Sequence, residues 1–308
     1  MIKNFSQRFL ALGIAIMVIS IIIIGALGIP FGIDFTGGAL TEVAYNTRPS
    51  IEDVEARLIE APLTDLGAYS LRETVNDTGH DGYILRTRDL TEDERQIVED
   101  VLLEIGEGGE VSRFASIGPV IGDELKNKAL WAVLGVVLVI VFYVAFAFRG
   151  VSKPVGSWWY GGITILALVH DVLVPTALMS VLGYTIGIEA DVLFVMAILA
   201  VLGYSVNDTI VVFDRVRENL LANQARNNHE SFEVIADRSV RQTFVRSINT
   251  SLTTFVALLA LYMFGGDVTR TFALVLMAGV VAGTYSSIFL ATPALIAVAR
   301  RQQKKNKS

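Results

Sequence analysis

Six apolar runs, each long enough to cross a lipid bilayer, constrain the fold of this chain more than any other feature. A helix of about 20 residues, rising 1.5 Å per residue, spans a hydrocarbon core of about 30 Å. The chain of 308 residues is 53% hydrophobic, more than is usual for a soluble domain. The sequence therefore predicts a multi-pass α-helical membrane protein with six transmembrane helices. The runs occupy 9–29 and, approximately, 130–148, 156–182, 192–213, 248–264 and 272–298.

Basic residues in the short segments between these runs indicate the orientation in the membrane. Lysines and arginines gather at 3–8, 149–153, 215–246 and 300–307. All four segments lie on one side if the six helices alternate in direction, and such residues are enriched on the cytoplasmic side. We therefore expect both termini in the cytoplasm. A cytoplasmic loop is expected within 214–246, and a basic tail over 299–308 that contacts membrane lipid.

The segment 30–126 is predicted to be an acidic domain on the opposite side of the membrane. It carries 21 acidic and 8 basic residues. Helices are expected to start at Ser50 and at Thr91, where Thr91 and Glu94 form a capping-box pattern. With the alternating patterns of the predicted strands, the order becomes β-α-β-β-α-β, which is typical of a small ferredoxin-like α+β domain. The strands are predicted at 39–46, 68–75, 82–87 and 110–117.

Several kinds of chemistry find no support in the sequence. The absence of cysteine excludes disulfides and thiol nucleophiles, and three histidines far apart in the chain disfavour a metal site. Gly32–Gly38, which reads GIDFTGG, is followed by no predicted helix, so it is a poor phosphate cradle. We expect no enzyme activity, no cofactor and no nucleic-acid partner. His80, in the polar turn between two strands, is expected to be a solvated loop residue, and Glu189 and Asp191 solvated loop carboxylates.

Ionisable residues inside the apolar runs are the candidate functional residues. A charged side chain at the centre of a membrane helix costs about 2.5–3.5 kcal/mol, so such residues need a partner, a water-filled cavity or a role. Asp208 lies in a polar stretch with Tyr204 and Asn207, and we expect it to titrate rather than to serve only as an interhelical hydrogen-bond partner. Asp171 follows His170 and precedes Pro175. A proton relay and a packing role are both open for Asp171.

Arg246 begins a polar stripe at helical spacing that continues with Asn249, Thr250 and Thr253. Such a stripe faces a neighbouring helix, and its depth is similar to that of Asp208 because the two helices are joined on the cytoplasmic side. The sequence therefore favours a pair between Asp208 and Arg246. A plain membrane anchor, with the guanidinium at the cytoplasmic headgroups, is the alternative for Arg246.

Five segments together resemble the SecD/SecF family of protein-export membrane proteins, in its SecF branch. The likeness extends from the first predicted helix to the sixth, and its most specific part is the long block at 203–219. In the first segment the family motif falls on Gly32, Asp34, Gly37 and Gly38. The segments are GIDFTGG at 32–38, SIGPVIGDEL at 116–125, ALVHDV at 167–172, GYSVNDTIVVFDRVREN at 203–219 and RSINTS at 246–251.

The resemblance implies half of a transporter of the resistance–nodulation–division superfamily, in which two six-helix halves use a proton gradient to move external domains. The other half would be SecD, and further partners would be the SecYEG channel, SecA, a YajC-like accessory and the unfolded preprotein. Asp208 and Arg246 match residues assigned to proton conduction in the family. Coupling to H⁺ or to Na⁺ stays open, and Val174-Pro175 departs from the family pattern next to Asp171.

Two other functions are compatible with an intramembrane carboxylate. A small-molecule exporter of the same superfamily would need a larger external region than 30–126. A passive scaffold of the export channel would use Asp208 only as a hydrogen-bond partner, so that replacing it with asparagine would have little effect.

Overall fold

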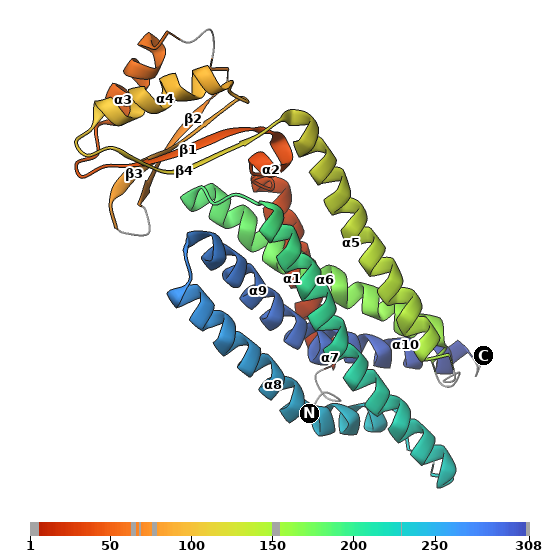
Figure 1. Cartoon of the computed structure of the whole chain (residues 1–308). Coiled ribbons are helices and arrows are strands. Elements are labelled where there is room, and N and C mark those ends of the chain that lie inside the picture. Colours follow the sequence, from red (N-terminus) through yellow and green to blue (C-terminus); the bar gives the residue numbers. More distant parts are fainter. Residues whose placement is uncertain are drawn as a thin grey trace. The chain divides into compact units, whose positions relative to one another are not determined.

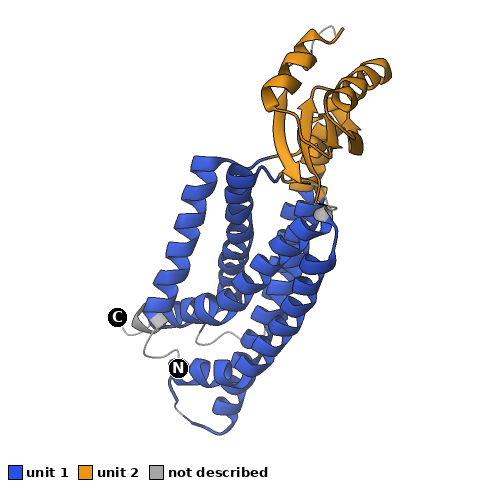
Figure 2. Ribbon diagram, turned by 90° about the vertical axis from the view of Figure 1, so that its left-hand side faces the viewer, with its two compact units in different colours: residues 1–30, 131–188, 193–308 blue, residues 31–130, 189–192 orange. Residues whose placement is uncertain are grey.

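The computed structural model describes residues 6–62, 66–67, 69–75, 79–149, 155–228 and 230–305, and His229 lies outside this set. The side chains of 6, 267–268 and 303–305 are likewise outside it. The chain divides into two compact units (Figure 2). The helical unit comprises Met1–Pro30, Trp131–Ile188 and Leu193–Ser308, and the α+β unit comprises Phe31–Leu130 and Glu189–Val192.

The α+β unit has the predicted ferredoxin-like topology (Figure 1). Its four strands form an antiparallel sheet in the order β2-β3-β1-β4. β2 and β3 form a hairpin, and β1 lies between β3 and β4 because α3 and α4 make the two crossovers. The elements are the short helix α2 (Ile33–Thr36), β1 (Gly38–Ala44), α3 (Ile51–Glu60), β2 (Ser70–Val75), β3 (Asp81–Thr87), α4 (Glu92–Ile105) and β4 (Glu110–Ile117).

Helix caps and apolar spacing explain why these segments fold as they do. Ser50 caps α3 by accepting a hydrogen bond from Asp53 N, and Thr91 and Glu94 form the predicted capping box at α4. Pairs of apolar residues four positions apart in the two helices face the sheet, so that one side of each helix is buried. The buried core contains Val54 and Leu58, Val98 and Leu102, and Val43, Tyr83 and Leu85 of the strands.

Six helices of the described chain are long and apolar enough to cross a membrane, which agrees with the six predicted spans. The sixth span combines α9, a π-helical turn η1 and α10. Within the helical unit α1 packs on α6, α6 on α9, and α9 on α8. The helices are α1 (Ser6–Leu27), α5 (Pro119–Ala147), α6 (Ser157–Ile186), α7 (Val192–Ala225), α8 (Phe232–Phe264), α9 (Asp267–Tyr285), η1 (Ser286–Ala291) and α10 (Thr292–Lys305).

The described part of 214–246, expected as a loop, is helical except for 226–228 and 230–231, because α7 and α8 continue well beyond their apolar runs. The C-terminal end of α7 and the N-terminal end of α8 share a buried core that includes Leu220 and Ile235. An i, i+4 ion pair between Asp237 and Arg241 adds support on the outer face of α8. The predicted tail is also helical as far as Lys305.

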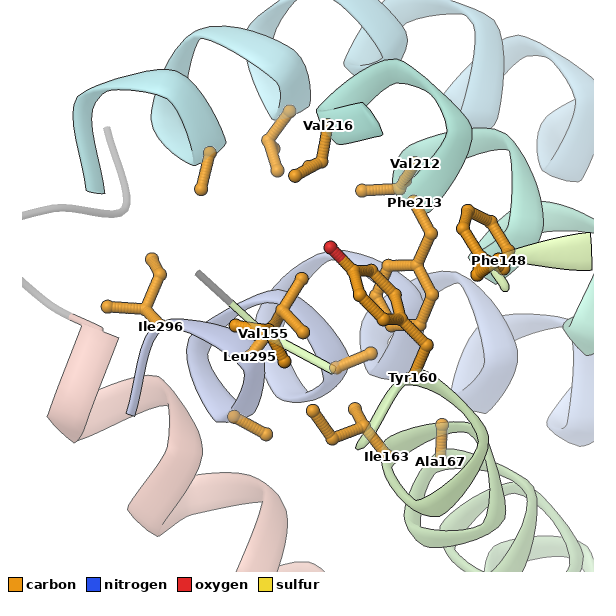
Figure 3. Close-up of a cluster of buried hydrophobic side chains, with 14 of the residues drawn as sticks. Phe148, Val155, Tyr160, Ile163, Ala167, Val212, Phe213, Val216, Leu295 and Ile296 are labelled. Atoms are coloured by element: carbon orange, nitrogen blue, oxygen red, sulfur yellow. The ribbon is translucent and has the colours of Figure 1, made fainter. Parts of the chain in front are cut away.

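An aromatic group joins the end of α5 to α6 and α7 (Figure 3). The rings of Phe148 and Tyr160 stack with centroids 5.0 Å apart, and Phe213 meets Tyr160 edge-on at 5.3 Å. All three side chains are buried, and Leu295 of α10 belongs to the same cluster. Aromatic pairs of this kind contribute about 0.5–1.5 kcal/mol beyond area burial, so the group fixes these helices against one another.

Two glycines let α9 approach α7 closely. A side chain at Gly279 would overlap Val201, and a Cβ at Gly283 would lie 2.9 Å from Ser205 Cβ. Small residues four apart are the usual means of close helix packing in membranes. The turn η1 that follows α9 is therefore held next to the polar part of α7.

Candidate functional site

Asp171 lies at the centre of the helical unit and is completely buried. Its Oδ1 is 2.8 Å from His170 Nδ1, and its Oδ2 accepts hydrogen bonds from Ser205 and, at 2.7 Å, from Ser286. The His170 ring stacks on Tyr285 with centroids 5.8 Å apart. Asp171 therefore joins α6 to α7 and η1 through hydrogen bonds.

Asp208 is held by serines of two other helical elements. Ser247 of α8 donates to its Oδ1 at 2.5 Å, and Ser287 of η1 donates to its Oδ2 at 2.5 Å. Ser205 lies three residues before Asp208 on the same face of α7. We call the set of two carboxylates, His170 and Ser205, Ser247, Ser286 and Ser287 the aspartate–serine cluster.

The π-helical turn explains how two adjacent serines serve two different aspartates. Consecutive residues of an α-helix point about 100° apart, and a π-turn changes that spacing locally. In η1, Ser286 and Ser287 are both fully buried, and each bonds one of the aspartates. Such turns are frequent at functional sites. The geometry of η1 thus brings the two carboxylates into one hydrogen-bonded unit.

Each of these serines has a second acceptor for its single hydroxyl proton. Ser286 Oγ lies 3.2 Å from the carbonyl oxygen of Gly283, and Ser287 Oγ lies 3.2 Å from that of Thr284. An ionised carboxylate only accepts hydrogen bonds, whereas a protonated one also donates. Protonation of either aspartate therefore allows its serine to turn to the backbone carbonyl, which rearranges the bonds between helices.

The predicted pair between Asp208 and Arg246 is not formed in this structure. In the part of the chain that the structure describes, Arg246 makes no ion pair, and its side chain is exposed. Ser247 is buried beside Asp208 instead. The residue of α8 that faces Asp208 is therefore the one that follows the predicted residue. The buried polar face of α8 carries Thr243, Ser247 and Ser251.

The other predicted site residues divide between an inner and an outer face. Tyr204 is inner: its hydroxyl donates to Ser251 Oγ at 3.3 Å. Asn207 of α7 and Asn249 of α8 are exposed, like Arg246. We call the exposed polar residues Asn207, Arg246, Asn249, Thr250 and Thr253 the outer polar stripe.

Sequence reasoning considered His170 and Asp171 as a neighbour pair, and the two side chains are in contact, but it missed the serines of η1. The available signal was Ser286-Ser287, two adjacent hydroxyls in a span that is otherwise mostly apolar.

No group of three or more His, Asp and Glu residues suited to a metal ion occurs among the described residues. His80 is exposed, as predicted.

Glu189 is not a solvated loop carboxylate, contrary to the prediction. It is partly buried and forms an ion pair of 2.5 Å with Arg86 of β3. Burial raises the pKa of Glu189 and lowers the pKa of Arg86, with their mutual attraction opposing both shifts. The family motif lies close by, since Asp34 accepts a hydrogen bond of 2.9 Å from Val192 N.

Comparison with known families decides what kind of protein carries this cluster. A family profile described as "Protein export membrane protein SecD/SecF, C-terminal" matches residues 97–301, and one described as "SecD/SecF GG Motif" matches 22–47. The chain belongs to the SecD/SecF family. The SecD/SecF profile covers most of the helical unit, including both aspartates.

Individual SecD/SecF proteins agree over nearly the whole chain. The "Protein translocase subunit SecF" of Thermobaculum terrenum is 40% identical over 96% of this chain and 92% of its own. That of Anaerolinea thermophila is 38% identical over 94% and 90%. The crystal structure of SecDF from Thermus thermophilus, a translocon-associated membrane protein, matches with a TM-score of 0.79 at 30% identity. The match covers 96% of this chain but only 38% of that SecDF chain.

Proposed function

We propose that this chain is a SecF-type subunit that uses the proton gradient across the bacterial cytoplasmic membrane to drive late steps of preprotein export. The observation that carries the proposal is Asp208. It is an intramembrane carboxylate held by two serine hydroxyls from two other helical elements, with no cation bonded to it among the described residues. Intramembrane carboxylates commonly mark proton pathways.

The energy available from one proton is of the right size to change this arrangement. One elementary charge crossing 100 mV releases about 2.3 kcal/mol. A hydrogen bond to a charged group contributes about 1.5–3 kcal/mol. One proton can therefore exchange the bond that Ser287 makes to Asp208 for a bond to the carbonyl of Thr284, and so loosen α7 from η1.

Asp171 belongs to the same pathway in this proposal. Ser286 and Ser287 are consecutive, and each donates a hydrogen bond to one aspartate. A change of protonation at one carboxylate therefore also affects the backbone that positions the serine of the other. His170 Nδ1 lies 2.8 Å from Asp171 Oδ1, so the two side chains can share one proton.

The outer polar stripe is the surface proposed for SecD. An exposed arginine and two exposed asparagines are unfavourable against lipid, and a second membrane half supplies partners for them. In the fused SecDF of Thermus thermophilus both halves share one chain. Arg246 would then pair with a carboxylate of SecD.

The remaining assignments follow the family resemblance. Both termini lie in the cytoplasm, and the α+β unit lies outside, where it meets the unfolded preprotein leaving the SecYEG channel. SecA and a YajC-like accessory are further partners of the assembly. The positive-inside distribution of Lys and Arg supports this orientation.

The test is completion of preprotein translocation in energised vesicles after ATP is removed, comparing wild type with Asp208→Asn at equal levels of complex. We expect the substitution to abolish the gradient-driven step, because an amide cannot carry the proton. Imposing an H⁺ or a Na⁺ gradient separately identifies the ion. Normal export by Asp208→Asn would favour the passive scaffold, and drug sensitivity without an export defect would favour a small-molecule exporter.

A further inference from the structure

The polypeptide passes between the helical unit and the α+β unit at only four points: 30/31, 130/131, 188/189 and 192/193. Any movement passed along the chain from one unit to the other must use these points. The Gly32–Gly38 motif follows the first of them directly. Within the α+β unit, this motif contacts the segments that lead to the other three points, which are 189–192 and the start of α5.

The motif holds residues 189–192, at the junction of the α6–α7 loop with α7, through backbone groups and the Asp34 side chain. Gly32 N donates to Ala190 O at 2.8 Å, and Phe31 forms a parallel β-bridge with Ala190. Asp34 Oδ2 accepts the bond from Val192 N, which is the first residue of α7. The first amides of a helix lack partners within it and favour a negative charge, so Asp34 acts as a cap supplied by a distant part of the chain.

Two glycines bring the same motif against the start of α5 and the end of β3. Gly37 has φ +71°, and a Cβ there would lie 2.7 Å from Pro119 Cα. Gly38 has φ +115°, and a Cβ there would lie 2.5 Å from the carbonyl oxygen of Thr87 at the end of β3. Positive φ and backbone contact at both positions require glycine. The motif continues without a break into β1.

A partly buried ion pair adds a second link between the loop and the sheet. Arg86 Nη1 lies 2.5 Å from Glu189 Oε1, and Arg86 is paired with Leu40 in the β1–β3 ladder. Arg86 Nε and Nη2 are buried without a partner among the described residues. Removing Glu189 would leave a buried cation uncompensated, which is strongly unfavourable.

From these contacts we infer that the Gly32–Gly38 motif is a clamp that passes displacement of α7 to β1, with Asp34 and Glu189 as positioning residues. The inference rests on the proposed function, in which α7 moves when Asp208 changes protonation. Asp208 lies about 24 Å along α7 from Val192, at 1.5 Å per residue, and a continuous helix transmits displacement over that length. The clamp gives the motif a mechanical role in place of ligand binding.

The test uses the complete complex with its SecD-type partner in proteoliposomes. The chain has no cysteine, so a single introduced cysteine carries a spin label without background from this chain, and cysteines of the partner are replaced first. One reporter replaces exposed Glu60 in the α+β unit, and another replaces exposed Ala222 on α7. In wild type both spectra should change when a proton gradient is imposed. Asp208→Asn should abolish both changes.

Asp34→Ala should leave the Ala222 response intact while it reduces the Glu60 response and gradient-driven translocation at least tenfold. Asp34→Asn keeps an acceptor for Val192 N and should retain both. Glu189→Arg should be defective and Arg86→Glu with Glu189→Arg should restore function, which separates lost coupling from misfolding. A full Glu60 response with Asp34→Ala, or no rescue by either control, would overturn the clamp. No Ala222 response in wild type would instead overturn the proposed function.

Discussion

At the scale of single residues, the proposed coupling step depends on where one serine proton goes. Ser287 Oγ lies 2.5 Å from Asp208 Oδ2 and 3.2 Å from Thr284 O. An ionised carboxylate is a stronger acceptor than a backbone carbonyl, so in the proposed function the shorter contact belongs to ionised Asp208. The longer contact becomes the alternative when Asp208 carries a proton.

Ser287→Ala removes one of the two hydroxyl donors to Asp208. Because a hydrogen bond to a charged group contributes about 1.5–3 kcal/mol, we expect gradient-driven export to fall roughly 10- to 100-fold. Ser287→Thr keeps the hydroxyl and should retain most of the activity. The measurement is the rate of gradient-driven translocation at equal levels of complex, and equal rates for Ala and wild type would contradict this role of Ser287.

Sequence reasoning singled out the two aspartates as candidates because carboxylates are rare in apolar runs. It failed to predict the serines that donate hydrogen bonds to these aspartates. Serine is common in membrane helices and carries little signal alone, and the π-turn that orients Ser286 and Ser287 leaves no visible periodicity. The choice between Arg246 and Ser247 as the neighbour of Asp208 depended on about 100° of helix rotation, which tertiary packing decides.

At the scale of elements, the close approach of α9 to α7 is what lets η1 reach the aspartates. Gly279→Ala places a methyl group against Val201. Overpacking of this kind typically costs about 1–3 kcal/mol, so we expect a lower thermal unfolding temperature in detergent and weaker export.

Gly162→Ala on α6 is the matched control for that substitution. Its added Cβ would have no neighbour within 4 Å, and alanine is favoured over glycine inside a helix. Its stability should equal or exceed that of wild type. If both alanine variants unfolded at the wild-type temperature, the close packing of α7 and α9 would not be essential.

The capping box of α4 makes the first turn of this helix sensitive to acid. Hydrogen bonds from the Arg88 side chain and from Thr91 N lower the pKa of Glu94 from 4.5 to about 2. A lowered pKa in the folded state means that stabilisation is complete above pH 4.5 and is lost as the pH falls towards 2.

Glu94→Gln tests this by keeping the cap while removing the charge that Arg88 contacts. At pH 7 the amides of the first turn of α4 should exchange with deuterium faster in the variant than in wild type. The difference should shrink as both proteins are brought to pH 3. A difference that stays constant with pH would show that the charge of Glu94 does not contribute.

At the scale of the whole molecule, the ferredoxin-like order and the six spans could be predicted because each depends on local periodicity. The strand 110–117 and the capping box of Thr91 and Glu94 are examples. The ion pair of Glu189 with Arg86 could not be predicted, because 103 residues separate the partners and nothing local marks a loop glutamate as buried. The contacts between Gly32–Gly38 and 189–192 also join residues that are far apart in the sequence, so they could not be predicted either.

The central claim is that Asp208 takes up and releases the proton that drives export. Infrared difference spectroscopy of the reconstituted complex, titrated with acid, measures this directly through the C=O stretching band of protonated carboxyl groups. We expect a band from an intramembrane carboxylic acid in wild type that is missing in Asp208→Asn and is still present in Glu94→Gln. Identical difference spectra for wild type and Asp208→Asn would contradict the account, since Asp208 would then not titrate.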